Sequence, residues 1–213
     1  MADVHGQAWA KIAARLAPEL PEGWAVRGGR GVSAKLVREP LGWTFPWVGL
    51  SRSRVADPPW LLTGVITLTG PADVWSARHG LRSDAVLRPG TVDMSAEDAL
   101  ERVRGFILDE ALPRVDQWNE ESLAESAELN LAAPADRRGN DFLDAAGWRV
   151  VRGTGSPVEP AREAIDFFST RLSPDDVSWY EGLIAAWEQG ERAAAMAYLE
   201  EQRQSSLRSL KLA

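Results

Sequence analysis

Cations and tryptophans are interleaved along residues 24–54, and this combination of residue types can bind another molecule. Six cations lie from Arg27 to Arg54 against a single acid, Glu39. Tryptophan and arginine are enriched at the centres of protein–protein interfaces. Aromatic rings beside cations can also stack on the bases of single-stranded nucleic acid. The predicted partner-binding residues are Trp24, Arg27, Arg30, Lys35, Arg38, Trp43, Trp47, Arg52 and Arg54.

Net charge favours protein binding over nucleic-acid binding for this region. The chain carries 24 basic and 31 acidic side chains, and its formal net charge of −7 repels a polyanion. The charge is uneven, because residues 1–90 carry 11 basic and 7 acidic side chains, whereas residues 91–213 carry 13 and 24. A structural interpretation also stands: the tryptophans form core and the cations solubilise the opposite face, as amphipathic strands do.

Residues that could support catalysis or metal binding are few. The chain has no cysteine and only two histidines, His5 and His79, which excludes thiolate nucleophiles, disulfides and a zinc site with three histidines. His79 with a carboxylate such as Asp84 offers a general base, so an enzyme is a third interpretation. His79 shares a strand pattern with Trp75 and Leu81, however, and no nucleophile motif accompanies it. We therefore predict no catalytic residue, no metal site and no cofactor.

Two further patterns have structural interpretations. Adjacent carboxylates such as Glu120 and Glu121 point about 100° apart on a helix, so they do not converge on one ligand. The run Gly28–Gly31 lacks the Lys-Ser/Thr pair and the helix that complete a phosphate-binding loop. It predicts instead a hairpin turn between strands at 24–27 and 32–36.

The spacing of apolar residues along the chain predicts the helices and strands that must position these side chains, and this spacing changes from one segment to the next. Helical spacing over 9–20 is followed by alternating strands at 24–27, 32–36, 43–48, 60–69 and 74–81. Pro46 cannot donate to a strand ladder, which predicts an edge strand or a bulge there. Helical spacing returns over 95–111 and is interrupted by Pro113. Residues 1–130 are therefore predicted to form an α+β domain with an N-terminal helix, an antiparallel sheet of about five strands and a long covering helix.

Residues 131–213 are predicted to form a helical annex packed on the first domain. Apolar stripes at 161–172, 173–187 and 190–210 indicate three helices, and the last two are separated by Gly190 and suit a helical hairpin. No apolar run approaches the roughly 20 residues that span a bilayer, and the first residues lack the pattern of a secretory signal. We therefore expect no membrane partner and a cytoplasmic location.

One stretch is similar to known bacterial proteins. The segment Pro59–Pro71 and the later His79–Arg82 resemble the core of a group of bacterial α+β proteins without an established activity, and the tail 193–212 is also similar to theirs. The chain departs from the group at Leu62 and Thr67, where an aromatic residue and a proline are more usual. This resemblance implies a fold and no catalytic residue.

A functional expectation comes from analogy. Bacterial proteins of this size and composition often accompany toxins as immunity partners. We therefore expect a non-enzymatic protein-binding module of immunity or antitoxin type, whose partner is another protein such as a basic toxin. A nucleic-acid-binding module using residues 24–54 is the alternative, followed by an enzyme with a carboxylate and His79.

Overall fold

The computed structural model describes residues 3–51, 59–71, 81–82, 93–133, 141–171 and 173–212. These residues form an α+β protein with an N-terminal helix, an antiparallel sheet and C-terminal helices, as the sequence predicts. The chain divides into two compact units. Unit 1 contains residues 1–66, 75–118 and 212, and unit 2 contains 67–74, 119–211 and 213.

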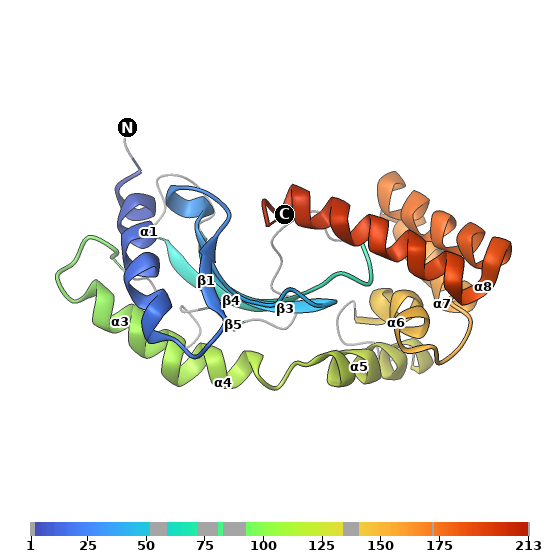
Figure 1. Cartoon of the computed structure of the whole chain (residues 1–213), viewed down its shortest axis with the longest axis horizontal. Helices are drawn as coiled ribbons and strands as arrows, with labels where there is room; N and C mark the ends of the chain where they lie inside the picture. The colour runs from blue at the N-terminus through green and yellow to red at the C-terminus, as the bar shows by residue number, and fades with distance from the viewer. Residues whose placement is uncertain are drawn as a thin grey trace. The chain divides into compact units, whose positions relative to one another are not determined.

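Unit 1 holds the sheet (Figure 1). Its strands follow the order β1-β2-β3-β4-β5. Its strands are β1 (Trp24–Arg27), β2 (Lys35–Arg38), β3 (Thr44–Ser51), β4 (Trp60–Thr67, the last residue of which belongs to unit 2) and the short β5 (Leu81–Arg82). Its helical segments are α1 (Val4–Leu16), η1 (Ala17–Glu19), η2 (Gly31–Ser33), α3 (Ala99–Gly105), η3 (Phe106–Ala111) and α4 (Leu112–Val115).

Helix α1 is the amphipathic helix expected near the N-terminus. The Asp3 side chain caps it by accepting from the backbone N–H of Gly6 at 3.0 Å. Its inner face buries Trp9, Ala13 and Leu16 completely. The indole of Trp9 also donates to the carbonyl oxygen of Ala34 at 2.8 Å, which attaches α1 to the start of β2.

The predicted hairpin forms, with a longer connection than the sequence suggested. Strands β1 and β2 pair antiparallel from Trp24 opposite Arg38 to Arg27 opposite Lys35. The expected second strand at 32–36 begins only at Lys35, because η2 occupies residues 31–33 and the N–H of Ala34 closes that turn. The chain leaves β1 through Gly28, whose φ of +87° favours glycine.

Strand β3 lies inside the sheet between β2 and β4, so the edge-strand alternative is wrong, and the alternative of a bulge at Pro46 stays a prediction. The ladder with β2 runs from Gly49 to Trp47 and stops one residue short of Pro46. Pro46 therefore does not need to donate a hydrogen bond to β2. Residues 45–50 are all buried.

The helical path over residues 99–115 continues through Pro113 and does not end there. The wider π-helical segment η3 precedes the proline, which then stands in the first turn of α4. Because proline lacks the N–H that would continue the helical hydrogen-bond pattern, one bond is lost here, although the backbone keeps helical angles at Ala111 and Leu112. The inner face of this path buries Val103, Phe106 and Val115.

Unit 2 consists mainly of helices: α5 (Glu120–Ala132), η5 (Asp141–Asp144), α6 (Ala145–Arg152), α7 (Val158–Ser169) and α8 (Pro174–Ser209). Helix α8 is broken at the expected place, because Gly190 and Glu191 have non-helical backbone angles. The halves fold back on each other, since Trp179 and Tyr198 are in ring contact across the break. The predicted helical hairpin is thus present.

A segment that continues β4 packs among the helices of unit 2. Residues 67–71 belong to this unit, and Thr69 is fully buried. A Cβ atom at Gly147 would lie only 1.9 Å from the carbonyl oxygen of Thr69, so this close approach requires glycine. Within the described part of the chain, no helix has both the length and the apolar character needed to cross a membrane.

Candidate functional site

The structure places the two predicted strand arginines in ion pairs. Arg27 contacts Glu39, with its Nε donating to the carboxylate at 2.8 Å. Arg38 contacts Asp116 at 2.5 Å, and its guanidinium also lies 6.0 Å from the ring centroid of Trp24. Both arginines therefore have an acidic partner within unit 1.

The predicted tryptophans are mostly part of the core. Trp24 is 7% exposed and Trp47 is 2% exposed, whereas Trp43 is half-buried. Rings buried to this extent cannot stack on the bases of a nucleic acid. The structural interpretation, in which the tryptophans form core, therefore describes Trp24 and Trp47.

Lys35 is also buried, although strand alternation suggested a solvated side chain. Its ammonium donates to the carbonyl oxygen of Val32 at 2.6 Å and lies 5.9 Å from the ring centroid of Trp47. The opposite residue on β3 is Gly49, where a Cβ atom would lie 2.3 Å from Cδ of Lys35. Glycine thus leaves room for the lysine stem. Burial lowers the pKa of Lys35 to about 8.

The remaining predicted residues are one described arginine and residues that the structure does not describe. Arg30 is exposed in the connection between β1 and β2. Arg52, Arg54 and His79 lie outside the described residues. Binding of a partner through residues 24–54 therefore stays a prediction.

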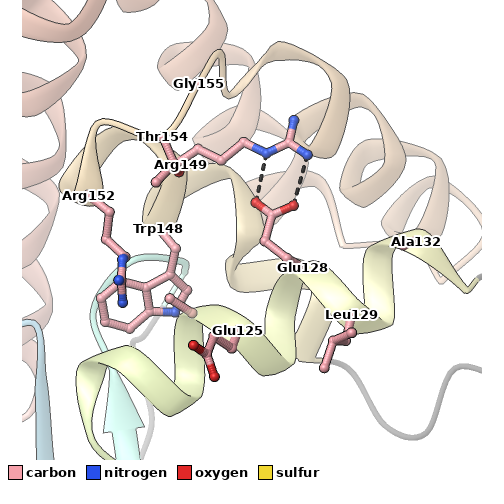
Figure 2. Close-up of a pocket in the computed structure, with 10 residues that line it drawn as sticks. Glu125, Glu128, Leu129, Ala132, Trp148, Arg149, Arg152, Thr154 and Gly155 are labelled. Carbon is pink, nitrogen blue, oxygen red and sulfur yellow. Dashed lines mark hydrogen bonds and ion pairs between the residues drawn. The ribbon is translucent and has the colours of Figure 1, made fainter.

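Unit 2 contains a pocket that sequence reasoning did not identify. It has a volume of about 720 Å³ and lies between α5 and the C-terminal end of α6 (Figure 2). The lining residues are Ala124, Glu125, Glu128, Leu129, Ala132, Trp148, Arg149, Arg152, Thr154 and Gly155. A pocket of this size falls within the range of about 300–1,000 Å³ that is usual for ligand sites.

Local sequence defines where both walls of the pocket begin or end. Helix α5 begins with a capping box, in which Asn119 and Ser122 exchange side-chain to backbone hydrogen bonds. Helix α6 ends at Gly153, which has a left-handed φ of +68° and donates to the carbonyl oxygen of Val150. The guanidinium of Arg192 also donates to Val150 at 2.9 Å. These caps hold the ends of the pocket walls in place.

A network of charges joins the two walls. Arg149 donates from Nε and one terminal nitrogen to both carboxylate oxygens of Glu128, at 2.7 and 2.9 Å (Figure 2). Its other terminal nitrogen contacts Glu159 at 3.1 Å. The hydrogen bonds with Glu128 contribute most to raising the pKa of Arg149 above its ordinary value. A terminal guanidinium nitrogen of Arg152 lies 3.8 Å from a carboxylate oxygen of Glu121.

The apolar part of the pocket combines a buried ring with an exposed leucine. Trp148 is 1% exposed, and its indole nitrogen has no hydrogen-bond partner among the described residues. Leu129 is 71% exposed. It lies away from the buried stripe of α5, which is formed by Leu123, Ala124 and Ala127. A leucine outside the apolar stripe of its helix was the sequence signal that could have pointed to this pocket.

Comparisons with known proteins add no family to these observations. No family model, curated protein or solved structure matches the chain. Among the described residues, no group of three or more His, Asp or Glu side chains is arranged to hold a metal ion. The pocket is therefore interpreted from its own chemistry.

Proposed function

We propose that the chain is a protein-binding module, of the immunity or antitoxin type expected from its composition, and that the pocket between α5 and α6 contacts its partner. One observation carries the proposal: Leu129 is 71% exposed beside a pocket lined by Trp148 and two arginines. Isolated surface leucines are ordinary. Here the leucine lies beside a concavity whose lining includes two arginines, and arginine is enriched at binding hot spots.

The charged residues around the pocket support the same function. Protein interfaces typically have an apolar centre and a polar rim. Here Leu129 supplies exposed apolar surface, and Glu125, Glu128 and Arg152 supply charged side chains beside it. Because Glu128 holds Arg149 in a bidentate pair, one side of the pocket is ordered before any partner arrives. Such pre-ordering reduces the entropy lost on binding.

Site-specific photo-crosslinking tests the proposal. The full chain would carry a benzophenone amino acid in place of Ala132, which lines the pocket, or in place of Leu108, an exposed residue of unit 1. In the cells that produce the chain, we expect a protein adduct from position 132 only. Adding Leu129→Ser should reduce its yield about tenfold, as loss of a hot-spot residue does.

Three outcomes would count against the proposal. Equal adducts from positions 132 and 108 would indicate non-specific contact. An adduct from position 132 that persists with Leu129→Ser would show that the pocket is not the contact surface. A nuclease-sensitive adduct would instead favour the nucleic-acid alternative.

A further inference from the structure

Helix α8 reverses its direction within two residues. Gly190 and Glu191 have non-helical backbone angles, and the segments 174–189 and 192–209 on either side of them are helical. Glu191 has φ 50° and ψ −138°. A residue with a side chain adopts this left-handed region only at a cost in free energy. The helical hairpin is therefore closed by a two-residue hinge, and one of the two residues is strained.

Both halves of α8 bury apolar side chains within unit 2. The buried residues are Trp179, Tyr180 and Leu183 in the first half and Ala195, Leu199 and Leu207 in the second. If the hairpin opened in an isolated chain, these side chains would face water, which is unfavourable in proportion to their apolar area. An opened chain therefore needs a surface that covers both halves again.

The contacts of the second half are contacts that another copy of the chain can supply. Tyr198 donates to the carbonyl oxygen of Trp179 at 2.7 Å, and the two rings lie 6.0 Å apart. Arg192 donates to the carbonyl oxygens of Val150 and Val151 near the end of α6, at 2.9 Å each. None of these contacts uses a hinge residue. A second chain therefore offers the same partners to the second half of α8.

A straight hinge makes such an exchange geometrically simple. With helical angles at Gly190 and Glu191, α8 becomes one continuous helix of 36 residues that is about 54 Å long. The two halves are of similar length, so two such helices lying antiparallel cover each other's halves. Short hinges under strain favour this exchange of identical elements between chains.

We infer that the partner of α8 is a second copy of this chain, and that two chains exchange the second halves of α8 to form a domain-swapped dimer at high protein concentration. The strain at Glu191 is released in the dimer because its backbone becomes helical. This release offsets part of the entropy lost when two chains associate. The inference goes beyond the proposed function and does not depend on it, because the exchange does not use the pocket side chains.

Refolding of the full chain at two concentrations tests whether the dimer forms. The chain is unfolded in urea and refolded at about 1 mM or at about 1 µM, because association depends on protein concentration. Size-exclusion chromatography with light scattering then gives the mass. We expect a dimer after refolding at the higher concentration and a monomer at the lower one. Monomers at both concentrations, for the wild type and for Gly190→Ala, would overturn the inference.

A nuclear Overhauser measurement tests whether the dimer is swapped. Chains labelled with ¹³C are mixed with unlabelled chains before refolding, and the isolated dimer is examined for contacts between a labelled and an unlabelled chain. We expect such a contact between the rings of Tyr198 and Trp179, which lie 6.0 Å apart. The spectrum of Tyr198→Phe assigns the signal. A dimer in which these rings are in contact only within one chain contradicts the exchange.

Two hinge variants should shift the equilibrium in opposite directions. Gly190→Ala should raise the dimerisation constant about tenfold or more, because alanine favours the straight helix. In the hairpin, its Cβ atom would also lie only 3.0 Å from that of Ala194. Glu191→Gly should lower the dimerisation constant about tenfold or more, because glycine adopts the hinge angles without strain and disfavours the helix.

Matched controls separate the hinge from general changes in helix stability. Gly105→Ala in α3 makes the same substitution away from the hinge. Glu188→Gly makes the other substitution in a segment that is helical in both the hairpin and the straight form. Both controls should leave the dimerisation constant unchanged. Hinge variants that shift it no further than these controls, or that shift it in the same direction as each other, would refute the role of the hinge.

Discussion

Tyr198 donates its phenolic hydroxyl to the backbone carbonyl oxygen of Trp179 at 2.7 Å, across the break in α8. The two rings lie 6.0 Å apart in an edge-on arrangement. The tyrosine can approach this closely because residue 182 is glycine, where a Cβ atom would lie 2.6 Å from the hydroxyl oxygen. One glycine thus determines how tightly the two halves of α8 pack.

Gly182→Ala should therefore destabilise the protein by about 1–3 kcal/mol, the usual effect of overpacking. In a Tyr198→Ala background the same change should become stabilising by up to about 1 kcal/mol, because alanine favours a helix and the clash is gone. Urea unfolding of the four proteins of this cycle measures the coupling. Gly105→Ala in α3 is the control and should stabilise, since its Cβ would meet no atom closer than 3.7 Å. A cycle without coupling would contradict the packing described.

Glu191→Gly should stabilise the protein by about 1 kcal/mol. Glu191 has φ 50° and ψ −138°, a region that glycine adopts without strain, and such strain costs about 1–3 kcal/mol. The gain exceeds the entropy that glycine adds to the unfolded chain, about 0.4–1 kcal/mol. Thermal unfolding compares it with Glu188→Gly, which lies in regular helix and should destabilise by about 1 kcal/mol. Equal losses of stability in the two variants would refute the strain.

Lys35 should make stability rise with pH above about 8. Burial lowers its pKa from 10.5 to about 8, so between these values the unfolded chain binds more protons than the folded chain. Stability then increases with pH across this window, by about 3 kcal/mol in total. The free energy of unfolding, measured with urea from about pH 7 to pH 10, should show this rise. Lys35→Met should remove the rise. The control Lys11→Met, which replaces an exposed lysine, should leave the rise unchanged.

A second group limits the pH range of that experiment. Burial raises the pKa of Tyr198 to about 12, with a smaller contribution from Glu201. Above about pH 10 an unfolded tyrosine loses its proton while the folded one keeps it, so stability falls again. A profile that rises only to about pH 10 is therefore expected. A Lys35→Met profile as steep as that of the wild type would contradict the assignment to Lys35.

Local patterns predicted much of the fold because they act within one element. The spacing of Trp9, Ala13 and Leu16 marked the buried face of α1, and Gly190 marked the break in α8. The environment of Lys35 was not predictable in this way. Alternation assigns a charged strand residue to solvent, but β2 lies between two other strands and Lys35, Leu36 and Val37 are all buried.

The pocket depends on pairs of residues that are distant in the sequence. Glu128 and Arg149 lie 21 residues apart, and neither has a neighbour in sequence that signals the other. Trp148 and Leu129 likewise come from different helices. Periodicity identifies the buried face of each helix and does not indicate which two helices meet, so the candidate site required the tertiary structure.

The segment 67–71 has a consequence for how the protein can be made. Because Thr69 passes against Gly147, a fragment that begins at Asn119 would lack a buried part of its own core. During synthesis this segment leaves the ribosome long before the helices that enclose it. The core of unit 2 can therefore be completed only after α6 has emerged, because the contact of Thr69 with Gly147 needs both segments.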